Sequence, residues 1–264
     1  MSHLLEVENL NIRFRTPSGV VNAVNDMSFH LDAGEIVGLV GESGCGKTMS
    51  QLAVMQLVPE QGEVSGRIFF EGSDLLKHPP RSKTMCDIRG KKIAMIFQEP
   101  ATSLNPVLTI GTQMTEMLEI HQGMSRRQAK NRAIELLTRV GIKDAEERLN
   151  DYPHQFSGGM LQRVMIAMAM SCCPRILIAD EPTSSLDAPI QAQILELLKE
   201  LVEQSTTAMM FVSHDLNLVA NFTERLYVMC TGQVVESGNC RDVFDKPAHS
   251  YTAELLNCVL DYTS

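Results

Sequence analysis

The stretch Gly41-Glu42-Ser43-Gly44-Cys45-Gly46-Lys47-Thr48 decides the fold of this chain. It has the pattern G-x-x-x-x-G-K-T, it follows the apolar run Ile36–Val40, and it precedes a segment of helical character, Met49–Leu57. A strand, a glycine-rich turn and a helix in this order are the context of a phosphate-binding loop. The sequence therefore predicts an α/β protein with a P-loop NTPase core.

The residues of this loop have separate expected roles. Gly41, Gly44 and Gly46 allow the backbone to bend where a Cβ atom would clash. The N–H groups of the loop then converge on a phosphate at the positive end of the following helix. Lys47 is expected to reach the β- and γ-phosphates, and the Thr48 hydroxyl to join the magnesium ligands. The chain is therefore expected to be a nucleotide-binding NTPase.

The composition limits the remaining classes of protein. The 264 residues are 44% hydrophobic with a formal net charge of −9, which argues against a general nucleic-acid binder because such a protein needs a basic face. No run approaches about 18 consecutive apolar residues, so no membrane span is expected. The start of the chain lacks the charged and apolar regions of a secretory signal. Seven cysteines without C-x-x-C spacing favour a reducing cytosol over zinc or disulfide frameworks.

Cys45 lies inside the phosphate loop, and two roles remain open for it. It can be a small side chain that fills space, or it can be a redox-sensitive thiol. The second role requires an exposed thiol with a lowered pKa, which the sequence does not reveal.

Alternation of apolar and polar residues predicts an antiparallel β region at the N-terminus. One strand is expected over Leu4–Phe14, with an irregularity near Asn9 where the alternation changes phase. A turn over Thr16–Gly19 leads to a second strand over Val20–Leu31. A further short strand is expected over Gly66–Gly72.

The whole chain is predicted to form a single domain with an inserted helical subdomain. Residues 1–103 and 157–245 carry the strand and helix patterns of the α/β core. Between them, in residues 104–156, apolar residues recur at helical spacing. Residues 246–264 are assigned to a C-terminal tail.

Several polar side chains follow apolar strands, where the carboxyl ends of parallel strands place ligands. The run Ile176–Asp180 ends in Asp180 and Glu181. Asp180 is expected to hold magnesium, directly or through water, and Glu181 to orient and polarise the attacking water. Gln98 and His214 each follow another apolar strand.

The segment Ser157-Gly158-Gly159-Met160-Leu161-Gln162 opens a predicted helix. Ser157 is a suitable N-cap, and the two glycines at a free helix N-terminus make a second candidate anion site. The alternative is a capped helix start that binds nothing.

The order of these motifs resembles that of the nucleotide-binding subunits of ATP-binding cassette (ABC) transporters, over roughly residues 4–245. By this resemblance Gln98 senses the γ-phosphate, Ser157–Gly159 binds the ATP held by a partner subunit, and His214 is the switch histidine. Phe14 matches the aromatic residue that stacks on adenine, although a core role in its strand is an equal alternative. Met160 stands where the family usually has Gln.

The resemblance implies ATP and Mg²⁺ as cofactors and a defined set of site residues. The residues implied to contact ATP are Phe14, Gly41, Ser43, Gly44, Cys45, Gly46, Lys47, Thr48, Met49, Ser157, Gly158, Gly159 and Asp187; those implied in catalysis are Gln98, Glu181 and His214; and those implied in holding Mg²⁺ are Thr48, Gln98 and Asp180.

Further stretches resemble the dipeptide, oligopeptide and nickel importers of this family, namely residues 97–106, 152–160 and 190–194. Residues 248–252 are similar to the His-Pro-Tyr-Thr element of that group, with Ser250 in place of Pro. The chain ends without the Cys-rich tail of longer peptide importers, as in shorter nickel or metallophore members. Peptides and nickel or metal chelates therefore both remain open as substrates.

The resemblance implies an ATPase subunit that energises an importer from the cytoplasmic face of the inner membrane, as a peripheral protein. The implied partners are two membrane-spanning permease subunits, a second ABC ATPase subunit (identical or related) and, indirectly, a solute-binding protein; no nucleic-acid partner is expected. A soluble ABC ATPase acting on nucleic acid or ribosomes is an alternative, but such proteins usually carry two cassettes. A P-loop kinase or GTPase would leave Ser157–Gln162 without a role.

Overall fold

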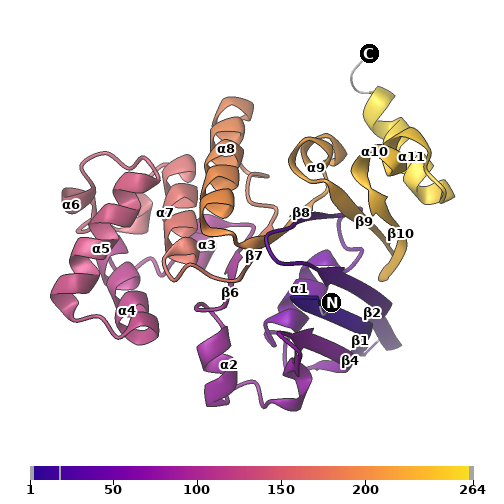
Figure 1. The fold of residues 1–264 in the computed structure, drawn as a ribbon, viewed down its shortest axis with the longest axis horizontal. Helices are drawn as coiled ribbons and strands as arrows, with labels where there is room; N and C mark the ends of the chain where they lie inside the picture. Colours follow the sequence, from indigo (N-terminus) through magenta and orange to yellow (C-terminus); the bar gives the residue numbers. More distant parts are fainter. Residues whose placement is uncertain (1–2, 18, 262–264) are drawn as a thin grey trace. The chain divides into compact units, whose positions relative to one another are not determined.

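The structure is a computed structural model that describes residues 3–17 and 19–261, and its elements cluster into two units (Figure 1). The first unit is drawn from Met1–Cys86 and Ala208–Ser264, and the second from Asp87–Thr207. The predicted helical insertion, residues 104–156, falls within the second unit.

The first unit contains a four-stranded antiparallel sheet. Its strand order is β2-β1-β4-β5. The bounds are β1 (Leu5–Thr16), β2 (Gly19–Leu31), β4 (Gly62–Phe70) and β5 (Ser73–Asp74). The predicted N-terminal strands are confirmed, while Ser18 of the predicted turn lies outside the described residues.

The predicted irregularity near Asn9 is a break in the register of β1. The pairing of β1 with β2 shifts between Val7 and Leu10, and Asn9 has a left-handed φ of 50°. The Asn9 amide group donates to Asp26 Oδ1 at 2.7 Å, and its backbone N–H donates to Ser28 Oγ at 2.9 Å. The extra residue therefore finds side-chain partners, as the unpaired residue of a bulge must.

Parallel strands in the first unit carry the phosphate loop. The central strand β3 (Ile36–Val40) lies between β8 (Ala208–Ser213) and β9 (Arg225–Cys230), parallel to both. Every residue of β8 is buried, as expected for a parallel strand covered on both faces. An antiparallel hairpin joins β9 to β10 (Gln233–Asn239).

The second unit combines two parallel strands with most of the helices of the chain. The strands β6 (Ile93–Ile96) and β7 (Ile176–Asp180) are direct neighbours. The helices are α3 (Pro100–Ser103), α4 (Ile110–Gln122), α5 (Arg126–Arg139), α6 (Ala145–Arg148), the 3₁₀ helix η2 (Pro153–Gln155), α7 (Gly158–Met170) and α8 (Ala188–Ser205).

Several short helices were not predicted from the sequence. They are η1 (Leu75–Lys77) and α2 (Lys83–Ile88), together with α9 (Leu216–Phe222), α10 (Cys240–Asp245) and α11 (Ser250–Asp261) near the C-terminus. The helix α11 occupies much of the predicted tail, whose last three residues lie outside the described part of the chain. The helix α1 (Lys47–Val54) follows the phosphate loop as predicted.

The packing of α9 on β3 gives a first prediction. A Cβ atom added to Gly38 in β3 would lie 2.3 Å from Val219 Cγ1 in α9. We expect Gly38→Ala to destabilise the protein by about 1–3 kcal/mol in urea unfolding, because the core must shift to accept the methyl group. In a Val219→Ala background the added cost should be much smaller, because the obstructing methyl groups are absent. An equal cost in both backgrounds would contradict this packing.

Candidate nucleotide site

The phosphate loop has a backbone that favours glycine. Gly41, Gly44 and Gly46 have φ angles of 153°, 81° and 107°. A Cβ atom at Gly41 would lie 2.2 Å from the carbonyl oxygen of Met229, and one at Gly46 would lie 2.3 Å from that of Ala23. Side chains at these two positions would collide with backbone, which cannot move aside without disturbing β9 or β2.

Lys47 is the first residue of α1, and its ammonium group is held over the loop. The side chain is buried, and Nζ donates to the carbonyl oxygens of Gly41 at 2.7 Å and Glu42 at 2.9 Å. Gly46, the N-cap residue, has no side chain to occupy the N–H groups of the first helical turn. The loop therefore presents a cation together with the positive end of a helix, a combination that suits a phosphate.

Cys45 is buried within the same loop. Burial raises the pKa of its thiol, and this outweighs the opposing influence of Lys47, whose Nζ lies 3.9 Å from Sγ. A redox-sensing cysteine needs the opposite, namely an exposed thiol with a lowered pKa. The structure therefore favours the space-filling role that the sequence left open.

Two hydrogen bonds connect the phosphate loop to the C-terminal part of the first unit. The N–H of Gly232, in the turn between β9 and β10, donates to the carbonyl oxygen of Cys45 at 2.9 Å. The N–H of Glu42 donates to the hydroxyl group of Tyr251 in α11 at 3.2 Å. The segment that resembled a His-Pro-Tyr-Thr element thus contacts the phosphate loop directly.

Glu236 in β10 fixes the start of α11 and hence the position of Tyr251. Its carboxylate accepts hydrogen bonds from the N–H groups of Ala248 at 2.7 Å and His249 at 3.0 Å. Burial alone would raise the pKa of Glu236, but these hydrogen bonds outweigh it and lower the pKa. The carboxylate is thus charged at neutral pH and stabilises a helix N-terminus, as an anion there should. Sequence reasoning missed Glu236 because its partners are backbone groups.

The second unit brings two of the predicted catalytic residues together. Gln98, just after β6, donates through Nε2 to Glu181 Oε2 at 2.9 Å. Because β6 and β7 are parallel neighbours, the residues after their carboxyl ends lie side by side. Asp180, the last residue of β7, is 2% exposed, and Glu181 has a left-handed φ of 46°. A non-glycine residue in this conformation is uncommon and occurs preferentially at functional sites.

The segment at Ser157 starts a capped helix, as predicted. Ser157 is the N-cap of α7, and its hydroxyl oxygen accepts from the N–H of Met160 at 3.4 Å. Gly158 is exposed, whereas a Cβ atom at Gly159 would lie 2.8 Å from Ile190 Cγ2 in α8. Gly159 therefore has a packing reason to be glycine, whereas Gly158 lies exposed at the start of α7.

The other predicted contact residues lie at exposed or half-buried positions of the two units. In the first unit, Phe14 is half-buried in β1 beside Gly62, and His214 is exposed after β8. Thr48 and Ser43 are exposed at the phosphate loop, and Met49 is half-buried in α1. In the second unit, Asp187 is the exposed N-cap residue of α8.

Comparisons with known proteins show the family to which the chain belongs. The family model described as ABC transporter matches residues 24–184. The chain is 50% identical to the oligopeptide transport ATP-binding protein OppD of Bacillus subtilis over 258 residues, which are 97% of this chain and 72% of that protein. It is 46% identical to OppD of Escherichia coli over 256 residues, covering 97% and 75% of the two chains. The dimeric ATP-binding cassette MJ0796 bound to ADP and Pi matches with a TM-score of 0.78 and 29% identity, over 90% of this chain and 99% of that one.

The chain therefore belongs to the ABC transporter family. As a member of this family it is an ATPase, which binds ATP and hydrolyses it. The predicted fold class is confirmed. The relatives that match nearly the whole chain are transport proteins, so we do not retain the alternatives of a nucleic-acid or ribosome-associated ATPase, a kinase or a GTPase.

The bond between Tyr251 and Glu42 gives a second prediction. Tyr251→Phe removes only the hydroxyl group, so the Glu42 peptide group loses an anchor and the loop becomes less ordered. We expect the KM for ATP to rise about 2- to 10-fold, since a single hydrogen bond contributes about 0.5–1.5 kcal/mol. The thermal unfolding midpoint should change little. The control is Tyr152→Phe, an exposed tyrosine of the second unit. Equal KM values for the two variants would show that the bond does not order the loop.

Proposed function

We propose that this chain is the ATP-hydrolysing subunit of a membrane importer for peptides. The observation that carries the ATPase part is the phosphate loop, where left-handed glycines, the N-terminus of α1 and the held Lys47 ammonium group provide a cradle for phosphates. The importer part rests on the likeness to oligopeptide transport proteins over 97% of the chain.

The donor set also fits Mg²⁺, which we propose as the second cofactor. Thr48, Gln98 and Asp180 offer hydroxyl, amide and carboxylate oxygens, the hard ligands that this ion takes. The Asp180 carboxylate is placed at the carboxyl end of a buried strand, where a fixed charge can serve a bound cation. When bound, Mg²⁺ would neutralise charge that develops on the phosphates.

For the hydrolysis itself, we assign separate roles to the protein groups. Lys47 faces the phosphates with a charge that the loop carbonyls already hold in place. Glu181 orients and polarises the attacking water, and Gln98 positions that carboxylate through its amide group. His214 acts as the switch residue that the family resemblance implies. Phe14 stacks on the adenine.

We further propose that catalysis requires a second ATPase subunit, either a copy of this chain or a relative. Ser157–Gly159 offers a hydroxyl group and exposed backbone at a helix N-terminus, which suits the ATP held by a partner. Asp187 would act at the same interface. The dimeric state described for MJ0796 supports this arrangement.

The role of Glu181 gives a third prediction. Glu181→Gln keeps the size of the side chain but cannot polarise water as a carboxylate does, so we expect kcat to fall at least about 100-fold, as for the loss of a general base. MgATP binding should persist. ATP-bound dimers should accumulate, and light scattering should detect them. Lys47→Ala should instead weaken nucleotide binding itself.

Glu196→Gln in α8 is the matched control, because Glu196 is an exposed glutamate of the same unit. It should retain normal turnover. Turnover of Glu181→Gln within a few-fold of the unaltered protein would remove Glu181 from the proposed role.

Peptides are the substrate class that the relatives favour over nickel or metal chelates. The two OppD proteins are named for oligopeptide transport, and each matches almost the whole of this chain. The absence of a Cys-rich tail, which pointed to metal importers, concerns only the end of the given sequence and does not outweigh that likeness. Calorimetric titration of the associated solute-binding protein with peptides and with nickel chelates separates the two classes.

We propose two membrane-spanning permease subunits as partners, with this chain bound peripherally to their cytoplasmic side. Along residues 3–17 and 19–261, none of the helices combines the length and apolar character that crossing a membrane requires. In the helical segment, the large apolar side chains of Val107 and Ile120 are 76% and 68% exposed, and their burial against a partner would be favourable. Such side chains favour this segment as the surface that contacts the permease.

This docking surface gives a fourth prediction. Glu116 and Glu119 are exposed in α4, next to Ile120. We expect Glu116→Lys and Glu119→Lys to reduce ATP-driven peptide uptake in reconstituted vesicles by at least half, because the reversed charges oppose docking. ATP hydrolysis by the isolated subunit should stay normal. Glu203→Lys in α8 is the control. Normal assembly and uptake by both α4 variants would refute the docking role.

A further inference from the structure

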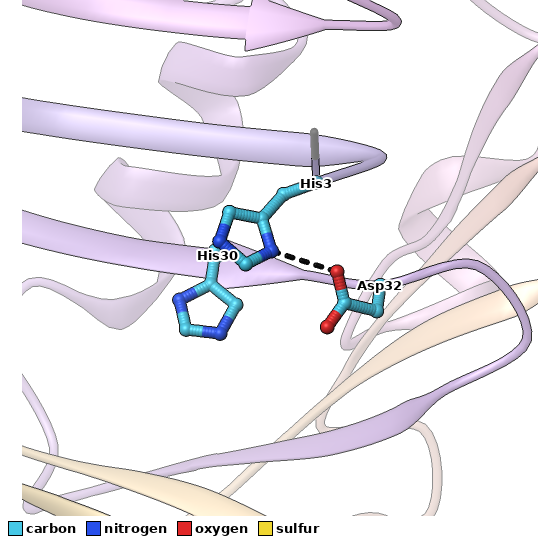
Figure 2. Close-up of side chains that lie close together, drawn as sticks. All are labelled: His3, His30 and Asp32. Atoms are coloured by element: carbon cyan, nitrogen blue, oxygen red, sulfur yellow. Dashed lines mark hydrogen bonds and ion pairs between the residues drawn. The ribbon is translucent and has the colours of Figure 1, made fainter. Parts of the chain in front are cut away.

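A second cluster of chemically active side chains lies in the first unit, apart from the phosphate loop (Figure 2). His3 comes just before β1, whereas His30 and Asp32 lie at the end of β2 and directly after it. The N–H of Leu4 donates to the carbonyl oxygen of Leu31 at 3.0 Å, which brings the start of one strand against the end of the other. One ligand atom from each of the three side chains lies within 4.8 Å of the other two.

We propose that His3, His30 and Asp32 form a binding site for a divalent first-row transition metal ion of the zinc type. Two imidazole nitrogens and one carboxylate oxygen are donors that suit such ions, whereas Mg²⁺ and Ca²⁺ prefer oxygen alone. Three protein ligands leave one tetrahedral position for water. The site is separate from the proposed magnesium ligands Thr48, Gln98 and Asp180.

His30 is prepared to act as a ligand. Its ring is half-buried and lies edge to face with the ring of Tyr227, at a centroid distance of 6.3 Å. The hydroxyl group of Tyr227 lies 3.3 Å from His30 Nδ1. With Nδ1 donating its proton to this hydroxyl oxygen, Nε2 would keep the lone pair that binds a metal, in the manner of partners that fix metal-bound histidines.

The side chains of His3 and Asp32 already lie together at the place where an ion would bind. His3 Nδ1 and Asp32 Oδ1 are 2.7 Å apart and share a hydrogen bond. An ion would replace the proton in this bond, and the N–H of the His3 ring would move to Nε2. The rings of His3 and His30 are stacked at a centroid distance of 3.9 Å. The two rings would have to turn slightly to aim one nitrogen each at an ion beside the Asp32 carboxylate, whose ligand atom already lies within 4.8 Å of theirs.

The surrounding charges allow a cation at this cluster. Arg225 donates to the backbone carbonyl oxygen of His30 at 3.0 Å, but its guanidinium group is also paired with the Glu35 carboxylate at 2.7 and 2.9 Å. His30 and Arg225 also line an open cavity of about 440 Å³, so an ion in this cavity would meet His30 directly. A bound ion would link His3 to the end of β2 and so stabilise the pairing of β1 with β2.

The test uses the full chain without an affinity tag, titrated with Zn²⁺ alone and with Co²⁺ alone. We expect one high-affinity ion per chain and a Co²⁺ absorption spectrum typical of nitrogen and oxygen ligands, without the strong bands of thiolate ligands. The variants His3→Gln, His30→Gln and Asp32→Asn should each weaken binding at least about 10-fold, the loss found for altered metal sites. The thermal unfolding midpoint should rise with Zn²⁺ only in the unaltered protein.

His154→Gln and Asp245→Asn are matched controls, because these exposed residues lie outside the cluster. They should bind the ion like the unaltered protein. ATP hydrolysis by each cluster variant checks that the fold is intact and is expected to be normal, since none of the three residues belongs to the nucleotide site. Failure to bind one ion, or binding that His30→Gln and Asp32→Asn leave unchanged, would overturn the proposal without affecting the assignment as an ATPase.

Discussion

The loop between β3 and α1 must reverse the chain within a few residues while its N–H groups point inward, and the neighbouring parts of the first unit fit this constraint. The backbone carbonyls of Met229 and Ala23 occupy the space that Cβ atoms at Gly41 and Gly46 would fill. The end of β9 and the strand β2 can approach the loop so closely only because those positions are glycine. One local requirement for phosphate binding thus fixes how both sheets of the first unit meet the loop.

Features that depend on a local sequence pattern were predictable, whereas features that depend on distant contacts were not. The apolar run before Gly41 and the alternation in β1 are local patterns with periods that report buried and half-buried strands, and both strands were found. The nearness of Gln98 and Glu181 also followed, because parallel neighbours place their ends together. The bond from Glu42 to Tyr251 joins residues 209 positions apart, so no local pattern reveals it. The six-residue α10 and seven-residue α9 are too short for a clear helical period.

Glu181 illustrates a further limit of sequence reasoning. The sequence shows a carboxylate after a buried strand, but it does not show that this residue adopts φ 46°. Such a conformation costs about 1 kcal/mol or more for a residue with a side chain, so the surrounding structure must hold it. The hydrogen bond from Gln98 and the turn in which Ser184 donates to the Glu181 carbonyl oxygen provide that support. In the role proposed for Glu181, this conformation would aim the carboxylate at the attacking water.

The hydrogen bonds that link the phosphate loop to Gly232 and Tyr251 act by preorganising the loop, because each contributes little free energy by itself. Each of the bonds from Gly232 to Cys45 and from Glu42 to Tyr251 contributes only about 1 kcal/mol net. Their effect is to fix two peptide groups of the loop, so that fewer arrangements of the loop remain. A ligand that meets an ordered loop does not have to supply the ordering entropy from its own binding energy. The C-terminal helix α11, although far along the chain from the loop, therefore helps to order the phosphate loop through Tyr251.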